Sequence, residues 1–340
     1  MKITKIRASL LAASLTMGGC AAPDFVSTDF KKMTPEIKDQ QVIPTYQTIK
    51  VQAHKEITDN NQVVDLVNLT ENMDSKVQIS APTASPTQDA VTYAVIDGAN
   101  QSQMFRQSTL STAKTTIGDN RSLNITPTYT RDGQYLLFSS SRSGNGQSLW
   151  RIRSDGAGGV TRITSGSSMD IAPSLVDDDE TVVFQSFGAQ RPGSYVWSVN
   201  LNGGLLTELS EGETPSVSPD GRQVLFVKTA PGGQKQVWSM RIDGSSPTQV
   251  SSGNANDITP SWHPSGRFIV FASDEMGAGE EDKKKNFNVW LMRADGTDRQ
   301  QVTSNESYDD SPVFLKNGRT LIFRSNRGGL WNLYKTNPKI

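Results

Sequence analysis

The stretch PSWHPSGRFIVF, from Pro260 to Phe271, decides the fold because its outline recurs along the chain. In every copy an aromatic residue stands eleven positions after a proline. The prolines are Pro82, Pro127, Pro173, Pro215, Pro260 and Pro312. The aromatic residues are Tyr93, Phe138, Phe184, Phe226, Phe271 and Phe323. A repeat period of roughly 40 to 50 residues is typical of propellers and other repeat architectures, so the chain contains six similar units.

Each unit contains the pattern of four short strands separated by turns. In the unit that starts at Pro260, the predicted strands are Ser261–Trp262, Arg267–Phe271, Asn288–Met292 and Arg299–Thr303. A Pro-Ser-Gly turn joins the first two strands. The last two are joined by an Asp-Gly pair, a strong hairpin signal. An Asp-Gly or Asn-Gly pair stands at this place in four units, as Asp155-Gly156, Asn202-Gly203, Asp243-Gly244 and Asp295-Gly296.

The third predicted strand of each unit carries a second aromatic residue, which we expect to pack between neighbouring units. These residues are Phe105, Trp150, Trp197, Trp238, Trp290 and Trp331. Four-stranded units that bury both faces against one another stack radially into a propeller. The sequence therefore predicts an all-β protein with a six-bladed β-propeller of four-stranded blades over residues 76–340.

The last unit has room for only three strands before the chain ends at Ile340. Lys76–Ser80 lies just before the first unit and resembles the fourth strand Gln300–Thr303. We predict that Lys76–Ser80 completes the sixth blade. Such a closing N-terminal strand would remove an open sheet edge.

Two segments, Ser216–Phe226 and Ser261–Phe271, resemble the repeats of TolB-type propellers, and the similarity extends over about Lys76 to Ile340. The resemblance implies a protein of the bacterial envelope that docks a protein partner. This chain departs from TolB itself in having a shorter segment before the propeller and an apparent lipid-attachment site. A fold of this kind supports many functions, so the site must be argued separately.

The N-terminus has the pattern of an export signal. Lys2, Lys5 and Arg7 precede an apolar run from Ala8 to Met17, which is too short to span a bilayer. The run ends in Met-Gly-Gly-Cys, which resembles the bacterial lipobox and predicts that residues 1–19 are removed and Cys20 is lipidated. A free thiol or an intermolecular disulfide is the alternative for this single cysteine. Ala21 in place of Asp implies, by resemblance to the sorting rule, an outer-membrane anchor facing the periplasm, with the cell surface as the alternative.

Residues 20–75 are rich in polar residues and contain two strand-like stretches, Tyr46–Val51 and Val63–Leu69. We interpret this segment as a tether or small extension that lifts the propeller from the membrane. The alternative is that part of it docks on the propeller or on a partner.

The loops between second and third strands should emerge on one face of the propeller, where we expect a protein partner to bind. The fifth unit has the longest such insertion, Asp274–Asn288, which is either a solvated flap or a partner contact. Mixed charge on this rim suits a protein better than a polyanion. The candidate partner-binding residues are Arg142, Arg191, Lys228, Lys235, Glu280, Glu281, Asp282, Lys283, Lys284, Lys285 and Arg327.

Catalysis and cofactors find little support. His54 and His263 are the only histidines, which leaves no His-based metal cluster and little scope for a Ser-His-Asp triad. Oligogalacturonate lyases have a similar propeller but use several metal-binding histidines. The acids at the unit starts, Asp170, Asp257 and Asp309, could bind a cation, but turn capping explains them more simply.

The sequence thus favours a non-catalytic scaffold without cofactor or metal, acting in an envelope or secretion assembly. A net charge of -1 does not indicate nucleic-acid binding. The competing hypotheses are an enzyme that acts on cell-envelope sugars or peptides and a sensor of a cation or small ligand.

Overall fold

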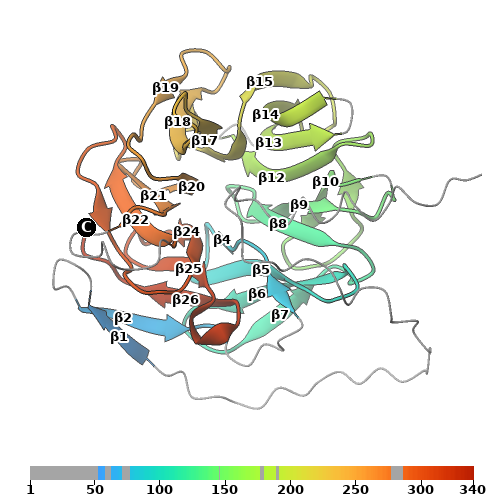
Figure 1. The fold of residues 1–340 in the computed structure, drawn as a ribbon. Coiled ribbons are helices and arrows are strands. Elements are labelled where there is room, and N and C mark those ends of the chain that lie inside the picture. Colours follow the sequence, from blue (N-terminus) through green and yellow to red (C-terminus); the bar gives the residue numbers. More distant parts are fainter. Residues whose placement is uncertain are drawn as a thin grey trace, which may run out of the picture. The chain divides into compact units, whose positions relative to one another are not determined.

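The computed structural model describes residues 53–57, 63–70, 77–144, 146–176, 180–188, 191–276 and 286–340. Within this part of the chain, six antiparallel sheets surround a common axis, which confirms the predicted six-bladed β-propeller (Figure 1). The only helix described is the 3-10 turn η1 (Arg327–Gly329). No helix in the described part is both long and apolar enough to cross a bilayer.

The blades follow one another along the chain. Blade 1 contains β3 (Gln78–Ile79), β4 (Thr83–Ala84), β5 (Ala90–Ile96), β6 (Ser102–Ser108) and β7 (Lys114–Ile117). Blade 2 contains β8 (Asn124–Tyr129), β9 (Tyr135–Ser140), β10 (Ser148–Arg153) and β11 (Thr161–Arg162). Blade 3 contains β12 (Met169–Leu175), β13 (Thr181–Gly188), β14 (Arg191–Asn200) and β15 (Thr207–Glu211).

The second half of the ring repeats this plan. Blade 4 contains β16 (Glu213–Val217), β17 (Gln223–Thr229), β18 (Lys235–Arg241) and β19 (Thr248–Gln249). Blade 5 contains β20 (Asp257–Trp262), β21 (Phe268–Ser273), β22 (Asn288–Arg293) and β23 (Gln300–Gln301). Blade 6 contains β24 (Asp309–Phe314), β25 (Leu321–Ser325) and β26 (Asn332–Thr336), extended by β2 (Val63–Asn68) and β1 (Ala53–Ile57).

The aromatic register that predicted the repeat forms the core. The six aromatic residues of the second strands are all buried, with at most 1% of their surface exposed. In blades 1 to 5 the second aromatic residue lies directly across the sheet from the first, for example Trp290 opposite Phe271. In blade 6 the prediction of Trp331 was wrong, because Tyr334 is the residue opposite Phe323. The short turn η1 between β25 and β26 shifts the register and leaves Trp331 outside the repeat position.

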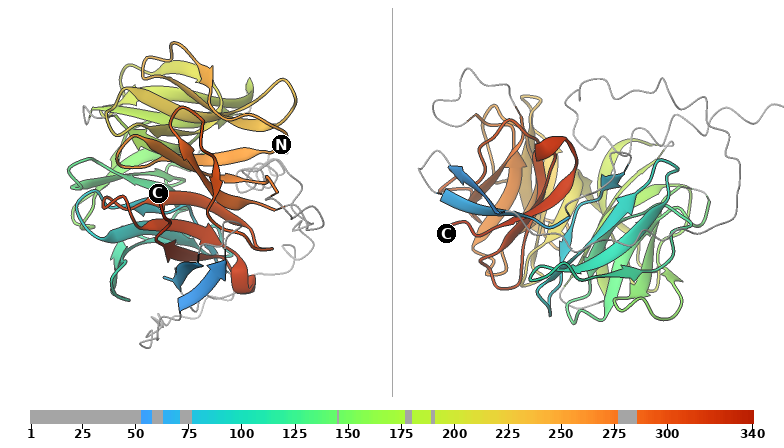
Figure 2. Two further views of the ribbon diagram at one scale, coloured as in Figure 1. Left: turned by 90° about the vertical axis from the view of Figure 1, so that its left-hand side faces the viewer. Right: turned by 90° about the horizontal axis from the view of Figure 1, so that it is seen from below.

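The strand that closes the ring also differs from the prediction. β2 pairs with β26 and supplies the fourth strand of blade 6, and β1 adds a fifth strand outside it (Figure 2). Residues 78–79, from the predicted closing strand, instead pair with β5 in blade 1. The spacing in the sequence indicates this pairing, since Ile79 stands three residues before Pro82, and the first strands of the other blades begin two to four residues before their prolines.

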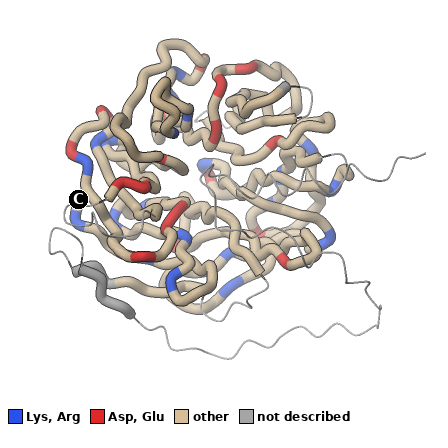
Figure 3. Tube along the Cα trace, in the orientation of Figure 1, with Lys and Arg blue, Asp and Glu red and all other residues tan. Residues whose placement is uncertain are grey.

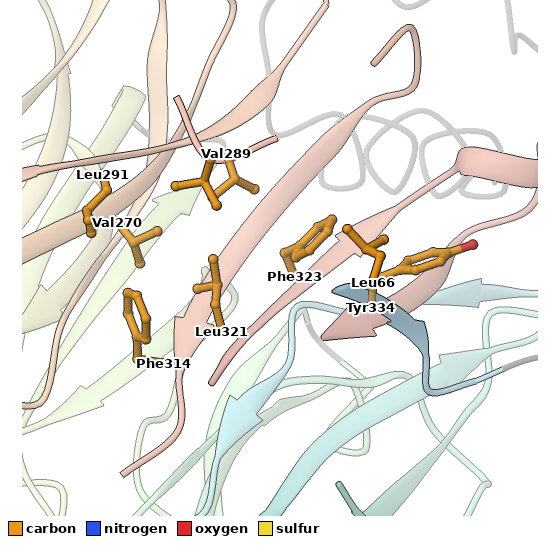
Figure 4. Packing of buried hydrophobic residues seen from close by; sticks show 9 residues of the cluster. Leu66, Val270, Val289, Leu291, Phe314, Leu321, Phe323 and Tyr334 are labelled. Carbon is orange, nitrogen blue, oxygen red and sulfur yellow. The ribbon is translucent and has the colours of Figure 1, made fainter. Parts of the chain in front are cut away.

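Burial of one leucine explains why β2 is chosen. Leu66 is fully buried against Phe323 and Tyr334, in a cluster that continues into blade 5 through Leu291 (Figure 4). The pairing with β26 continues beyond β2, because the Leu69 N–H donates to the Leu333 carbonyl oxygen at 2.8 Å. Both ends of the propeller chain are thereby held in one sheet. Blade 1 packs against this sheet through a shared hydrophobic cluster that includes Tyr93 and Ile322.

The first strand of each blade lies nearest the axis (Figure 1) and has a bulge just before its proline in blades 2 to 6. The bulged residue has a positive φ near +50° although it is not glycine: Thr126, Ala172, Thr214, Thr259 and Ser311. The surrounding contacts maintain this rare conformation. For example, the Ser311 N–H donates to Thr259 Oγ1 of the preceding blade at 3.2 Å.

The topology creates two faces with different content. Because strands alternate in direction, the first-to-second turns and third-to-fourth hairpins emerge on one side, which we call the turn face. The second-to-third loops and the connections between blades emerge on the other, which we call the loop face. The predicted partner-binding loops belong to the loop face.

Candidate functional surface on the loop face

The predicted partner-binding residues divide into three groups. Arg142, Lys228, Lys235 and Arg327 are described with their side chains. Arg191 begins β14, but its side chain lies outside the described part, as do residues 280–285 and the predicted lipidation site Cys20. Partner binding by these residues stays a prediction.

Arg142 and Arg327 occupy equivalent places in blades 2 and 6. Each Nε donates to the serine two residues earlier, Ser140 or Ser325, at 2.9 Å. One terminal nitrogen of each guanidinium donates to the residue that begins the blade. Arg142 donates to Asn124 at 3.1 Å, and Arg327 donates to Asp309 at 2.7 Å.

The two guanidinium groups also lie over aromatic rings of their own blade. Arg142 lies 5.2 Å from the ring centroids of Phe138 and Trp150, and Arg327 lies 5.3 Å from Phe323 and 5.0 Å from Tyr334. Only 14% and 13% of these side chains are exposed. Both guanidinium groups therefore interact mainly with groups of their own blade, through ion pairing and cation-π contact.

The charge of the buried arginine is balanced differently in these two blades. In blade 6 a fully buried carboxylate, Asp309, pairs with Arg327. In blade 2 the corresponding residue is neutral Asn124, and the nearest carboxylate is Asp119 at 3.9 Å. Burial accordingly lowers the pKa of Arg142, and Asp119 offsets this only in part.

Blade 5 fills the same space from another strand, which the sequence did not predict. Arg299 comes from just before β23, yet it lies 4.7 Å from Phe271 and 5.2 Å from Trp290. It donates to both carboxylate oxygens of Asp257, at 2.8 and 2.7 Å. Burial alone would lower the pKa of Arg299, but Asp257 and then Glu275 outweigh it and raise that pKa.

The sequence holds one sign that blade 5 places its arginine differently, because an acid stands where blades 2 and 6 have arginine. Glu275 stands two residues after Ser273, where blades 2 and 6 have arginine two residues after serine. Glu275 contacts Arg299 at 2.5 Å, and Arg299 also donates to Ser273 at 2.8 Å. Blades 2, 5 and 6 thus place a guanidinium at the same point in space, although in blade 5 it comes from a different position in the sequence.

Blades 3 and 4 use other polar groups at this level. In blade 3 the buried Asp170 accepts hydrogen bonds from Ser168 at 2.8 Å and Ser186 at 2.7 Å. In blade 4 Lys235 pairs with Glu213. Lys228 is more exposed, at 36%, and its Nζ lies 4.0 Å from Glu211. Charges of both signs are consequently spread around the ring rather than separated (Figure 3).

The seam between blades 6 and 1 holds a further buried pair. Arg324 donates to both oxygens of Asp310, at 2.7 and 2.6 Å, and to the Ile79 carbonyl oxygen at 2.8 Å. Burial would lower the pKa of Arg324, but the charge and hydrogen bonds of Asp310 raise it overall. Trp331 covers this guanidinium, with 4.5 Å between the guanidinium carbon and the ring centroid.

Trp331 belongs to an aromatic row across blades 5 and 6. Tyr308, in the connection between these blades, lies 4.9 Å from Phe287 and 5.8 Å from Trp331 between ring centroids. Phe287 is buried, whereas Tyr308 and Trp331 are half-buried. Met276, at the start of the blade 5 insertion, is 44% exposed. We call Met276, Phe287, Tyr308 and Trp331 the blade 5–6 patch.

His263 lies on the turn face and has a structural role there. Its Nδ1 accepts the Ser265 N–H at 3.1 Å, so Nε2 carries the hydrogen and donates to the Gly318 carbonyl oxygen at 2.8 Å. Its ring also lies edge-on to Phe268 and Phe314. The histidine thereby joins the turns of blades 5 and 6.

The candidate acids at the starts of the blades are all engaged. Asp257 and Asp309 pair with arginines, and Asp170 accepts two hydroxyl groups. Among the described residues, no group of three or more His, Cys, Asp or Glu side chains is arranged to hold a metal ion.

Comparison with known proteins confirms the resemblance to TolB-type propellers. A TolB homolog of Chlorobium luteolum is 28% identical over 148 residues, which is 42% of this chain and 31% of that protein. The match thus spans about a third of the length of that relative. No family model matches the chain.

Solved structures give the same fold. The structure of a putative TolB from Agrobacterium tumefaciens superposes with a TM-score of 0.58 at 19% identity, and the match covers 77% of this chain and 91% of that one. A gluconolactonase from Xanthomonas campestris superposes with a TM-score of 0.61 at 12% identity, covering 88% and 100%. At such identities the likeness concerns the fold, which enzymes and TolB proteins share.

Proposed function

We propose that this protein is a non-catalytic scaffold of the bacterial envelope that binds a protein partner through the blade 5–6 patch. The observation that carries the proposal is the position of Trp331. Tyr334 already fills the repeated core position, so packing within blade 6 does not require a tryptophan at 331. Trp331 instead lies half-buried beside Tyr308 on the loop face.

The chemistry of this patch supports a protein ligand. Tryptophan, tyrosine, methionine and arginine are the residues enriched at protein interfaces, and a few such anchors carry most of the binding energy. Here Arg324 holds one face of Trp331, and Arg324 is itself fixed by Asp310. A side chain held in place in this manner loses little conformational entropy when a partner binds.

The insertion of blade 5 adjoins the patch at Met276 and Asn286. Its sequence from Glu280 to Lys285 carries three acids followed by three lysines. We propose that these six residues form a charged border of the patch, and that Arg191 and Lys228 extend the charged rim over blades 3 and 4 and guide the partner to the apolar centre. Charged borders of this kind affect association rates and specificity more than affinity.

We further propose that Cys20 carries lipid and holds the protein at the outer membrane, facing the periplasm. The lipobox-like sequence before Cys20 supports this anchor, and similarity to a TolB homolog supports an envelope location. Metabolic labelling with a palmitate analogue tests it: wild-type protein should incorporate the label and Cys20→Ala should not. Equal incorporation by both would refute the anchor.

Photo-crosslinking in living cells tests partner binding. A photoreactive amino acid replaces Met276 or Trp331 in the patch, and Arg241 on the turn face as the matched exposed control. The same protein should be captured from positions 276 and 331 and not from position 241. Capture of no protein at the patch, or of identical proteins at all three positions, would contradict the proposal.

A second experiment measures the contribution of Trp331. With the captured protein purified, Trp331→Ala should weaken binding by at least about thirtyfold, as expected for an interface anchor worth roughly 2 kcal/mol or more. Deleting residues 280–285 should mainly slow association. Unchanged affinity for Trp331→Ala would remove the patch as the binding centre.

A further inference from the structure

Four hairpins on the turn face share one backbone geometry but not one chemistry. They join the third and fourth strands of blades 2 to 5, and each has a glycine N–H bonded to the carbonyl oxygen three residues earlier. These glycines are Gly156, Gly203, Gly244 and Gly296. In each hairpin the glycine and the residue two positions later both have positive φ. The four hairpins can therefore be compared position by position.

Blades 2, 4 and 5 place charged residues at equivalent positions of this hairpin. Three residues before the glycine stands Arg153, Arg241 or Arg293, and one residue before it stands Asp155, Asp243 or Asp295. In blade 2 these side chains form an ion pair at 2.7 Å. In blade 3 both charges are replaced by asparagine, at Asn200 and Asn202.

Blade 3 also places leucines where its sister hairpins have none. Its second residue with positive φ is Leu205, at +54°, whereas the sister hairpins have Gly158, Ser246 and Asp298 there. A leucine rarely adopts this conformation. Leu205 is nevertheless 79% exposed, and Leu206 beside it is 59% exposed. Most of the surface of both side chains is therefore left in contact with solvent.

A third exposed leucine lies on the same face. Leu110 is 78% exposed in the turn between β6 and β7, the third and fourth strands of blade 1. That turn, residues 108–113, carries no charge either. Leu110 and Leu205 are the two most exposed large apolar residues of the described chain, and both lie at tips between outer strands on the turn face.

We propose that the turn face rests on a lipid bilayer and inserts Leu110, Leu205 and Leu206 into its interfacial layer. Both tips emerge on the turn face, and blade 2 lies between the blades that carry them. A flat surface that approaches this face can therefore contact both tips. Within this hairpin of blade 3, loss of charge accompanies the leucines, as expected for a segment that enters a medium of low polarity. The adjoining turn between β12 and β13 is acidic in sequence from Asp177 to Glu180, so only the hairpin tip is expected to enter the bilayer, and anionic lipid is disfavoured beside it.

The remaining hairpins indicate which kind of bilayer suits this face. Those of blades 2, 4 and 5 carry arginine and aspartate together, so neither sign dominates at their tips. Such tips are compatible with zwitterionic headgroups and give no preference for anionic lipid. The contact is additional to an anchor at Cys20 and does not depend on one.

Fluorescence quenching at defined positions tests the contact with the full chain. Cys20→Ser removes the only native thiol, and Leu110→Cys, Leu205→Cys or Met276→Cys then introduces one site for a polarity-sensitive dye. The probe is a vesicle of phosphatidylcholine and phosphatidylethanolamine that contains lipid with a quencher on its acyl chain. Dyes at positions 110 and 205 should shift to the blue and be quenched, while the dye at 276, on the loop face, should not.

This comparison does not depend on how the N-terminus reaches the membrane, because all three variants share it. Absence of quenching at 110 and 205, or equal quenching at all three positions, would overturn the proposal. It would also fail if quenching required anionic lipid and disappeared in high salt, since basic side chains would then carry the binding.

Replacing the leucines gives an independent measure. Leu205→Ser with Leu206→Ser should lower quenching of a dye at position 110 and reduce partition into these vesicles by about tenfold or more, since ~1.4 kcal/mol corresponds to tenfold and a buried leucine exceeds this. Ser246→Ala, at the equivalent position in blade 4, is the matched control and should change neither. Unchanged partition of the double variant would exclude the leucines as the contact.

Discussion

Blades 5 and 6 have the same architecture but assemble it from different parts of the chain. In blade 5 four consecutive strands form the sheet, whereas blade 6 takes its fourth strand, β2, from the N-terminal side. Both place a guanidinium over two aromatic rings and beside a buried aspartate, yet Arg299 precedes the fourth strand of blade 5 and Arg327 follows the second strand of blade 6. The packed arrangement is therefore what the two blades share, and the sequence position of its parts is free to vary.

The largest expected effect concerns the strand that closes the ring. Leu66→Ala in β2 and Leu291→Ala in blade 5 remove leucines from one hydrophobic cluster, and each should cost about 2–5 kcal/mol of unfolding free energy. Only Leu66→Ala should also release β2 from β26. Urea unfolding measures the first effect, and hydrogen exchange at the Leu333 amide, which donates to Thr70, measures the second.

The comparison of these two variants tests whether β2 closes the propeller. Leu291→Ala is the control for loss of buried volume without loss of the closing strand. If Leu66→Ala leaves both the unfolding free energy and the exchange rate at Leu333 unchanged, β2 does not close the propeller.

The next effect compares the two buried carboxylates. Asp309→Ala removes the carboxylate that pairs with Arg327, and breaking such a buried pair costs roughly 3 kcal/mol or more. Asp257→Ala should cost less, because Glu275 remains beside Arg299. Thermal or urea unfolding of both variants measures the difference. An Asp257→Ala variant less stable than Asp309→Ala would show that Glu275 gives no compensation.

Sequence patterns predicted the ring because its cause is local and repeated. Proline begins each unit, and an aromatic residue eleven positions later faces the neighbouring blade, so the spacing alone indicates six sheets. The closing strand was misassigned because Val63–Leu69 and Lys76–Ser80 are both short β-rich segments, and the choice between them depends on Leu66 contacting Phe323 and Tyr334 in three dimensions. Trp331 was misplaced for a related reason, since η1 changes the strand register by an amount the sequence does not display.

The loop-face residues were predictable as charged loops but not in their contacts. Arg142 and Arg327 were identified, yet their burial over aromatic rings depends on packing between strands. Arg299 was missed because its partners Asp257 and Glu275 are distant in sequence. Tyr308 belongs to no recurring sequence pattern, so only its position beside Trp331 in the structure identifies it as a candidate.

A smaller net effect should follow from moving the guanidinium of blade 5 to the position used in blade 6. Arg299→Gln alone leaves Asp257 without its bidentate ion pair and should be destabilising by roughly 3 kcal/mol. Adding Glu275→Arg puts arginine two residues after Ser273, as Arg327 follows Ser325 in blade 6. The double variant should recover most of the lost stability, measured by a double-mutant cycle in urea.

The single variant Glu275→Arg in the presence of Arg299 is the control for this exchange. It brings two cations together and should be less stable than the wild type. If the double variant is no more stable than Arg299→Gln, the two arrangements are not interchangeable, and the position of arginine in the sequence matters after all.

The smallest effect lies in a hairpin that blade 5 has and blade 6 lacks, because the fourth strand of blade 6 enters from the N-terminal side. Asp295 accepts hydrogen bonds from the Thr297 hydroxyl at 2.6 Å and from its N–H at 3.0 Å, and these bonds lower the pKa of Asp295. Since unfolding restores the ordinary pKa, this carboxylate contributes stability at pH above that ordinary value. The contribution is lost as the pH falls through the lowered pKa. Acid should therefore weaken this hairpin of blade 5. Carboxyl NMR titration should show a low midpoint for Asp295 that rises in Thr297→Val, while Asp243, held by Ser245 in blade 4, keeps its own. An unchanged Asp295 midpoint in that variant would mean that the hydroxyl does not hold the carboxylate.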